Sequence, residues 1–336
     1  MVGERTLVDE VSGWLRIYDD GWVDRTWTGP PEAEFMSKPV PAHEDFIDGV
    51  ATRDVTIDPS LGLTVRIYVP KLKPGEDHKL PVLLHFHGGG FCISEANSYM
   101  YYHVYTQLVR TARVVCVSVN MRLAPEHRLP AACDDCYMAL LWLRAIARGE
   151  SFEPWLETHG DFTRVFLIGD SSGGNLVHEV AARAGSCKLS PLKIAGSIPI
   201  HPGFVRTERS KSEQELQNES PFLTLKMVDK FLALALPIGT NKGHPITCPM
   251  GSNAPPLATL NLPPMMVCIA EKDLIRDTGI EYCNALKKSG KDLEVFTSHG
   301  VGHSFYLNKI AIDMDPQTAD QTKQLLTAIT DFIQRH

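Results

Sequence analysis

Short apolar segments recur along most of the chain, and segments with helical periodicity separate them. The segments "DVTIDP" and "LTVRIYV", which follow residue 53, alternate apolar and polar positions as strands with one buried face do. Six later segments are apolar throughout, which suits strands buried on both faces of a parallel sheet: 80–86, 113–119, 164–169, 194–200, 264–270 and 293–298. Helical periodicity is clearest over 130–148, 174–184, 278–289 and 317–334. This alternation predicts an α/β fold, with a mostly parallel sheet covered by helices on both faces.

Two parts of the chain depart from this alternation. Residues 1–45 contain no predicted strand and hold three of the five tryptophans, Trp14, Trp22 and Trp27. We expect this N-terminal arm to pack on the rest of the protein, because large apolar side chains are rarely left together in solvent. Residues 201–250 carry a charged segment and one helical segment, "LTLKMVDKFLALAL", between two predicted strands. We interpret them as a cap inserted into a single domain that spans residues 46–336.

Composition and charge narrow the classes of partner. The 336 residues carry a formal net charge of -7, and we expect no nucleic-acid partner because phosphate binding needs a basic surface. No apolar run reaches the roughly 18 residues of a membrane-spanning helix. The first residues lack the basic and apolar regions of a secretion signal. The sequence therefore predicts a cytoplasmic protein whose cysteines are reduced.

The sequence contains no motif that indicates a cofactor or a metal ion. Cys133 and Cys136 lie two residues apart inside a helical segment, but no second pair accompanies them, so we expect core packing rather than zinc binding. His299 and His303 are four residues apart, but the glycines between them argue against a helix that would place both on one face. Glycine-rich nucleotide-binding motifs are also missing. We expect neither a cofactor nor a metal.

The segment "GDSSGGN" at 169–175 joins a predicted strand to a predicted helix. Gly169, Ser171 and Gly173 form the pattern G-x-S-x-G. A serine nucleophile on a sharp strand-to-helix turn needs residues without side chains two positions away on either side. The N-terminus of the following helix favours the negative charge that develops during reaction. We therefore identify Ser171 as the candidate nucleophile.

A second glycine-rich segment, "HGGG" at 87–90, follows the predicted strand 80–86. Glycine is costly to order in a folded chain, so three in a row indicate that this backbone must approach something closely. Ester hydrolysis passes through an oxyanion, which backbone N–H groups can stabilise. We assign the N–H groups of Gly88, Gly89 and Ser172 to an oxyanion hole. The alternative is a tight turn or close packing against a helix.

A histidine and a carboxylate are needed to activate the serine. His303 follows the last predicted strand, where the chain order Ser…Asp…His places the base. Asp273 lies just past the preceding strand and is our candidate acid. We expect Asp277 to cap the helix that begins near Thr278, and Glu271 to point to the other side of the strand. The remaining histidines considered, which we expect to be structural, are His85, His87, His178 and His299.

Together these segments resemble the hormone-sensitive-lipase branch of the α/β-hydrolases. The resemblance rests on "HFHGGGF", "RLAPEHRLPAACDD", "GDSSGGN", "EKDLIRD" and "GVGHSF", and runs from about residue 50 to the C-terminus. The segments "SGWLRIYDDGWVDRT" and "DGVATRDVTIDP" are similar to plant carboxylesterases of that branch. The resemblance implies an eight-stranded sheet, a lid built from the arm and the cap, and a triad of Ser171, Asp273 and His303. Met121 stands where the branch often has tyrosine, and we expect this difference to affect packing alone.

The resemblance implies one of three activities. Most plant members are esterases that act on small-molecule esters without a cofactor. Gibberellin receptors share the fold, but an aliphatic residue replaces their histidine, whereas His303 is present here. A few members are dehydratases of specialised metabolites, including 2-hydroxyisoflavanone dehydratases. We expect a carboxylesterase, with a dehydratase as the first alternative and a non-catalytic receptor as the second. The sequence leaves the oligomeric state open between monomer and dimer.

Overall fold

A large central sheet organises the protein. The computed structural model describes residues 5–73, 75–76, 78–217 and 223–336, and within them eight strands pair in the order β11-β10-β9-β8-β6-β7-β5-β4. Strand β5 runs antiparallel to both of its neighbours, and the strands from β7 to β11 are parallel. The predicted α/β fold with a mostly parallel sheet is confirmed. The strands are β4 (Val50–Asp58), β5 (Leu63–Pro70), β6 (Leu80–Phe86), β7 (Val115–Asn120), β8 (Gly160–Asp170), β9 (Ile194–Ile200), β10 (Met265–Ala270) and β11 (Leu293–Ser298).

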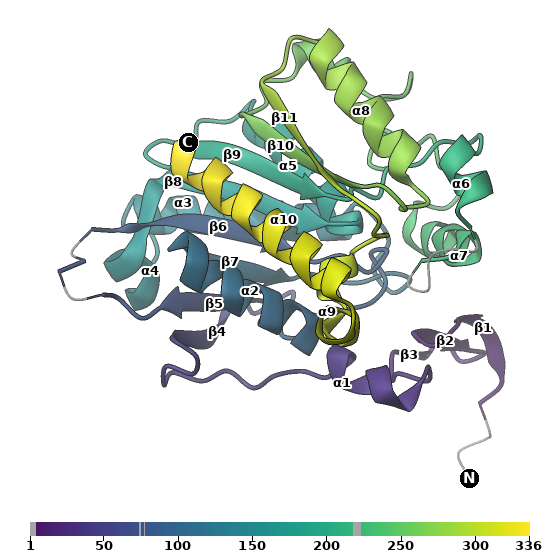
Figure 1. The fold of residues 1–336 in the computed structure, drawn as a ribbon, viewed down its shortest axis with the longest axis horizontal. Helices are drawn as coiled ribbons and strands as arrows, with labels where there is room; N and C mark the ends of the chain where they lie inside the picture. The colour runs from purple at the N-terminus through teal and green to yellow at the C-terminus, as the bar shows by residue number, and fades with distance from the viewer. Residues whose placement is uncertain (1–4, 74, 77, 218–222) are drawn as a thin grey trace.

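Helices cover both faces of this sheet (Figure 1). Strand β10 shows the division, because Met266 and Cys268 belong to the apolar cluster that includes α2 and α10, whereas Met265 and Val267 pack with α8. Helices α3 and α5 pack together and lie on the α8 side. The helices are α1 (Glu34–Ser37), α2 (Tyr99–Ala112), α3 (Ala131–Ala147), α4 (Pro154–His159), α5 (Ser172–Ala184), α6 (Lys211–Glu215), α7 (Leu225–Ala235), α8 (Arg276–Lys288), α9 (Lys309–Met314) and α10 (Pro316–Arg335), with short 3₁₀ turns at η1 (Pro31–Ala33), η2 (Leu257–Thr259) and η3 (Phe305–Leu307).

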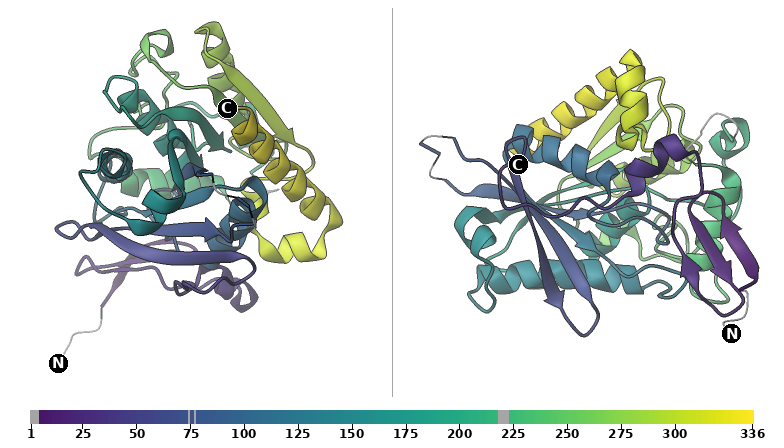
Figure 2. Two further views of the ribbon diagram at one scale, coloured as in Figure 1. Left: turned by 90° about the vertical axis from the view of Figure 1, so that its left-hand side faces the viewer. Right: turned by 90° about the horizontal axis from the view of Figure 1, so that it is seen from below.

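The N-terminal arm differs from the prediction. Instead of lacking strands before residue 53, it forms a separate antiparallel sheet from β1 (Leu7–Val11), β2 (Leu15–Tyr18) and β3 (Val23–Asp24), seen in Figure 2 beside the main body. Gly13 and Gly21 adopt positive φ angles of 80° and 81° at the two turns, which glycine does at little cost. The prediction failed because the strands are short and most of their side chains stay at least partly exposed, with only Val11 and Leu15 of them buried.

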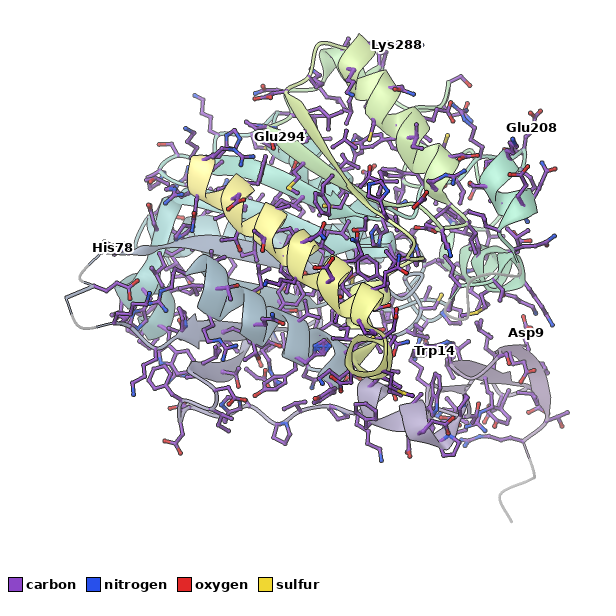
Figure 3. The ribbon with its side chains drawn as sticks, in the orientation of Figure 1. Asp9, Trp14, His78, Glu208, Lys288 and Glu294 are labelled. Atoms are coloured by element: carbon purple, nitrogen blue, oxygen red, sulfur yellow. The ribbon has the colours of Figure 1, made fainter. Side chains whose placement is uncertain are left out.

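The arm contacts the segment between β9 and β10. This segment contains α6 and α7, and it includes residues 218–222, which lie outside the described residues. Asp9 on β1 forms an ion pair with Lys230 on α7. Figure 3 shows Asp9 and Trp14 on the side of the arm that faces the rest of the protein. The arm and α7 therefore lie side by side near the edge of the main sheet.

The residues of the predicted site lie at the carboxyl ends of the parallel strands. Strands β6, β8, β10 and β11 all point the same way, so the loops after their carboxyl ends lie together, as is usual for ligand sites in such sheets. The glycine loop follows β6, Ser171 follows β8, Asp273 follows β10 and His303 follows β11. Among the described helices, none combines the length and the apolar composition needed to cross a bilayer.

Candidate active site

Ser171 occupies a sharp turn between β8, which ends at Asp170, and α5, which begins at Ser172. Its backbone angles, φ 51° and ψ -123°, are sparsely populated for residues with a side chain and are typical of strained functional positions. A Cβ atom on Gly169 would lie 2.5 Å from the carbonyl oxygen of Gly173, and one on Gly173 would lie 2.0 Å from that of Phe86. The predicted steric reason for both glycines is confirmed.

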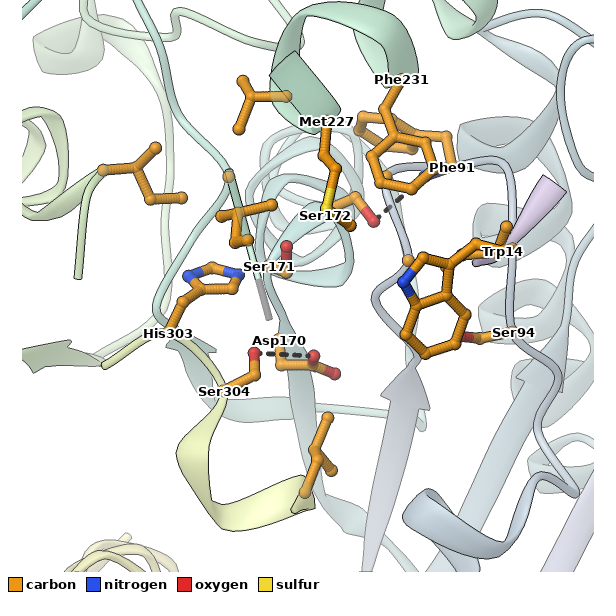
Figure 4. Close-up of a pocket in the computed structure, with 18 of the residues that line it drawn as sticks. Trp14, Phe91, Ser94, Asp170, Ser171, Ser172, Met227, Phe231, His303 and Ser304 are labelled. Atoms are coloured by element: carbon orange, nitrogen blue, oxygen red, sulfur yellow. Dashed lines mark hydrogen bonds between the residues drawn. The ribbon is translucent and has the colours of Figure 1, made fainter. Parts of the chain in front are cut away.

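His303 and Asp273 form a buried pair. His303 Nδ1 lies 2.7 Å from Asp273 Oδ2, and the two residues are 6% and 2% exposed. Asp273 Oδ1 also accepts a hydrogen bond from the N–H of Ile275, at 3.0 Å. His303 Nε2 has no hydrogen-bond partner within the described parts of the chain, and Figure 4 shows the imidazole directed toward Ser171. This is the arrangement in which an imidazole can accept a proton from a serine hydroxyl.

The pKa of His303 is set by opposing effects. Burial lowers it, but the charge of Asp273, the hydrogen bond to Asp273 and the charge of Asp170 together outweigh burial and raise it above its ordinary value. Asp273 therefore favours the charged, imidazolium form of His303.

The two other candidate acids lie elsewhere. Glu271 is exposed and accepts a hydrogen bond from the N–H of Gly300, at 2.8 Å, away from the pair. Asp277 does not cap the helix as predicted, because α8 begins at Arg276 and Asp277 falls in its first turn. Its carboxylate instead accepts a hydrogen bond from the N–H of Ser212 in α6, at 2.8 Å.

The remaining candidate histidines have structural contacts. His85 Nδ1 is bonded to the Ser118 hydroxyl at 2.7 Å, and His178 Nδ1 to the Tyr282 hydroxyl at 2.8 Å, with both rings buried. His87 Nδ1 approaches the carbonyl oxygen of Gly88 at 2.8 Å, and burial lowers the pKa of this ring to about 4. His299 is largely exposed and lies next to Glu271.

The structure of the glycine loop bears on one residue of the predicted oxyanion hole, Gly88. The N–H of Gly88 donates to the hydroxyl of Tyr101, at 2.8 Å, and to Asp170 Oδ1, at 3.1 Å. This N–H already has two acceptors, which argues against the predicted assignment of Gly88 to the oxyanion hole. Gly89 and Gly90 line the same pocket as Ser171, and their N–H groups make no hydrogen bond to any residue that the structure describes.

Both of these glycines are required by their surroundings. Gly89 has φ 103°, and a Cβ atom there would lie 2.4 Å from the carbonyl oxygen of Ile93. Gly90 has φ 61°, and its Cβ atom would lie 2.4 Å from the ring of Phe231 in α7. Ser172 also lines the pocket and is the first residue of α5, where a helix leaves its N–H groups without intrahelical partners. Three consecutive glycines thus allow the loop to pass between the Ser171 turn and α7.

The pocket over Ser171 and His303 is mainly apolar (Figure 4). Its empty space is about 850 Å³, which includes space open to solvent. The arm contributes Trp14, and helix α7 contributes Met227 and Phe231. Its other apolar lining residues are Phe91, Ile93, Met100, Val205, Leu223, Val228, Leu232, Ile275 and Leu307.

One polar residue in the pocket wall was not identified from the sequence. Asp170, directly before Ser171, is 1% exposed, and burial raises its pKa to about 6 although the nearby His303 and its hydrogen bonds oppose this. The sequence signal was present, because a carboxylate at the end of an apolar strand is unusual in a buried position. Within the described residues, no cluster of three or more His, Cys, Asp or Glu side chains could hold a metal ion, and Cys133 and Cys136 are buried free thiols.

Comparison with known sequences gives one family and several plant relatives. A family described as alpha/beta hydrolase fold matches residues 83–307. The chain is 39% identical over 311 residues to tuliposide A-converting enzyme 1, chloroplastic, of Tulipa gesneriana, covering 92% of this chain and 75% of that protein. It is 35% identical to 2-hydroxyisoflavanone dehydratase of Glycyrrhiza echinata, covering 96% and 95%. It is 36% identical to probable carboxylesterase 6 of Arabidopsis thaliana, covering 90% and 85%.

Solved structures of similar fold include esterases. An esterase from the archaeon Pyrobaculum calidifontis superposes with a TM-score of 0.69 at 26% identity, over 84% of each chain. The names of the tulip enzymes place those relatives in plastids, so a cytoplasmic location for this chain stays a prediction. The matched family, the plant relatives and the esterase fold lead to one conclusion: the chain belongs to the α/β-hydrolases, within the hormone-sensitive-lipase branch that includes the plant carboxylesterases.

Proposed function

We propose that this protein is a carboxylic ester hydrolase with Ser171 as the nucleophile, His303 as the general base and Asp273 as the acid. The observation that carries the proposal is the buried His303–Asp273 pair, whose free Nε2 opens on the same pocket as Ser171. A serine on a strained turn beside such a pair has the geometry of an activated nucleophile.

The reaction follows from these positions. His303 Nε2 accepts the proton of the Ser171 hydroxyl while Oγ attacks the carbonyl carbon of the ester, and Asp273 keeps the remaining ring proton on Nδ1. The N–H groups of Gly89, Gly90 and Ser172 stabilise the oxyanion, with Gly90 taking the place first assigned to Gly88. The alcohol leaves with the proton from His303. Water then attacks the acyl-enzyme by the same route and releases the acid.

The lining of the pocket suggests the kind of ester. Its apolar walls favour a small-molecule ester with an apolar acyl or alcohol group, since a strongly polar group would lose hydration without finding partners there. Trp14 from the arm and Met227 and Phe231 from α7 stand over Ser171. We propose that residues 1–45 and the segment 201–250 act together as a lid that excludes water and selects the substrate.

A series of p-nitrophenyl esters of increasing acyl length tests the proposal. We expect a burst of p-nitrophenol, formation of the free acid and a preference for acyl chains longer than acetate. Absence of turnover across the series, with binding of the same esters, would favour a receptor instead.

A dehydratase is the second candidate. It is favoured by the likeness to 2-hydroxyisoflavanone dehydratase over nearly the full length of both chains. Incubation with a 2-hydroxyisoflavanone distinguishes the two, because a dehydratase releases water and forms no carboxylic acid. Fast dehydration together with negligible hydrolysis of every p-nitrophenyl ester would replace the esterase proposal.

A further inference from the structure

Asp170 makes contacts that the proposed triad does not use. Its Oδ1 accepts the N–H of Gly88, at 3.1 Å, and its Oδ2 accepts the hydroxyls of Tyr101 and Ser304, both at 3.4 Å. The Ser304 contact is drawn in Figure 4. The two hydroxyl contacts are long for hydrogen bonds, and the N–H of Gly88 is the strongest partner by distance.

These contacts join three segments that carry the proposed chemistry. Asp170 directly precedes Ser171, Gly88 directly precedes Gly89 in the glycine loop, and Ser304 directly follows His303. Ser304 has φ 48°, so its backbone is held in a conformation that a residue with a side chain rarely adopts. One buried carboxylate thus connects the nucleophile turn, the glycine loop and the histidine loop.

Gly88 can lie close to Asp170 because it has no side chain. A Cβ atom on Gly88 would lie 2.5 Å from Asp170 Oδ2 and 2.9 Å from the carbonyl oxygen of Asp170. The first glycine of the loop is therefore required for the close approach to this carboxylate. The two glycines that follow remain available for the oxyanion.

The electrostatic surroundings agree with a role in the reaction. The charge of Asp170 is among the influences that raise the pKa of His303. The titratable groups around Asp170 and His303 include the buried phenols of Tyr101, Tyr105 and Tyr306, whose pKa values burial raises far above the ordinary range. They also include His201, whose Nδ1 accepts the N–H of Ser304 at 3.1 Å and whose pKa burial lowers to about 3. These groups are neutral near pH 7, whereas the charges of His303 and Asp170 influence each other's pKa.

We propose that Asp170 is a positioning residue: its carboxylate holds the glycine loop through Gly88 and the histidine loop through Ser304, in register with Ser171. The inference rests on the proposed ester hydrolysis and extends it. Because Asp170 acts through these loops, its removal should weaken binding of the transition state while binding of the ground state changes little.

Two substitutions at Asp170 distinguish the effect of its hydrogen bond to Gly88 from the effect of its charge. Asp170→Ala removes both, and we expect kcat for p-nitrophenyl butyrate to fall about 10- to 100-fold with little change in KM, as for other small misplacements of catalytic groups. Asp170→Asn retains an oxygen that can accept the N–H of Gly88, so it should recover most of the lost kcat. It lacks the charge, so the pKa of His303 should fall and the rising limb of kcat/KM should move to lower pH.

A pair of inhibitors provides the second measurement. A trifluoromethyl ketone adds to a serine nucleophile and places an oxyanion in the hole, whereas the matching methyl ketone binds mainly as the ground state. In Asp170→Ala, affinity for the trifluoromethyl ketone should fall by the same factor as kcat/KM, and affinity for the methyl ketone should stay near that of the wild type.

Tyrosine variants supply a matched control. Tyr101→Phe removes the hydroxyl shared by Gly88 and Asp170 and should reduce kcat. Tyr105→Phe removes an equally buried hydroxyl one turn along the same helix, which has no hydrogen bond to Gly88 or Asp170 in the described structure, and should leave kcat unchanged.

Several results would overturn the inference: wild-type kcat in Asp170→Ala, equal loss of affinity for both ketones, no recovery in Asp170→Asn, or an unmoved pH profile in Asp170→Asn. Should Asp170→Ala fail to fold, the pH profile and inhibitor affinities of Asp170→Asn and Tyr101→Phe decide. Failure of the proposed function looks different, because the wild-type protein itself would then hydrolyse no ester and form no adduct with the trifluoromethyl ketone.

Discussion

His303 and Asp273, which are 30 residues apart in the sequence, are joined by a 2.7 Å contact that is almost fully buried. Strands β10 and β11 create this contact, because they are parallel neighbours in register from Met265 with Leu293 to Ala270 with Ser298. The loops that follow them must therefore meet. The contact uses Nδ1 of the imidazole, so Nε2 can face Ser171 in the proposed reaction. Substitutions of Asp273 and of the nearby Asp277 test which carboxylate is the acid.

Replacing the acid by its amide is the first test. Asp273→Asn keeps the shape of the side chain but can donate to Nδ1, which favours the wrong tautomer of His303. We expect kcat to fall by roughly 10⁴-fold, as such a substitution does in a serine protease triad. Steady-state kinetics with p-nitrophenyl butyrate and circular dichroism measure the loss and confirm folding.

Asp277→Asn is the matched control for that test. Asp277 is partly exposed, follows the same strand and contacts Ser212 and Arg276 rather than His303. We expect a change in kcat of less than about tenfold, consistent with a residue outside the reacting groups. A larger loss for Asp277→Asn than for Asp273→Asn would show that the acid has been assigned wrongly.

The second test concerns the nucleophile. Ser171→Ala should reduce hydrolysis on the order of 10⁴-fold or more, in line with removal of a triad serine. A fluorophosphonate should label the wild-type protein at Ser171, as located by peptide mass spectrometry. Labelling of Ser172 or Ser304 in place of Ser171 would contradict the assignment, and both lie in the same pocket wall.

The pH dependence of kcat/KM is the third test. His303 cannot accept a proton while it is charged, so activity should rise with pH as it deprotonates. Because the nearby carboxylates raise its pKa above 6.5 despite burial, the midpoint of the rise should lie above 6.5. A midpoint well below this value in the wild type would mean that burial outweighs the charges of Asp273 and Asp170.

Much of the fold and of the site follows from local sequence patterns. The sheet could be predicted because strands buried on both faces are apolar throughout, and the Ser171 turn could be predicted because its glycines are required by local sterics. His303 and Asp273 follow from their positions after the last two strands. Each of these inferences depends on residues close together in the sequence.

The predictions that failed concern contacts between residues that lie far apart in the sequence. Which of three consecutive N–H groups is free could not be predicted, because Gly88 is engaged by Tyr101 and Asp170, which lie 13 and 82 residues away. The strands of the arm lack a clear apolar pattern, since most of their side chains remain partly exposed. The contact of Asp277 with Ser212 spans 65 residues and was equally beyond local reasoning.

The arm offers two tryptophans with contrasting surroundings. Trp14 lines the pocket and meets Trp27 edge to face, with ring centres 4.5 Å apart. Trp22, in the turn between β2 and β3 of the same arm, is 43% exposed and stacks with Tyr18 instead. The ion pair between Asp9 and Lys230 is also partly exposed and contributes at most about 1 kcal/mol. Arg25 provides a second charged contact of the arm, because it pairs with Glu126 and donates to the carbonyl oxygens of Cys92 and Ala124.

The fourth test uses these tryptophans to examine the proposed lid. Trp14→Ala removes a large apolar surface from the pocket wall, and we expect KM for a bulky p-nitrophenyl ester to rise much more than KM for p-nitrophenyl acetate. Ser171 and His303 are untouched, so a small fluorophosphonate should still label the variant. Trp22→Ala loses a side chain of the same size from the same arm and should change neither KM. If Trp14→Ala raises KM equally for both esters while Trp22→Ala raises it for neither, then Trp14 supports the catalytic groups and does not determine the choice of substrate. Equal losses in both variants, with a lower melting temperature, would show that the arm stabilises the protein and is not a lid.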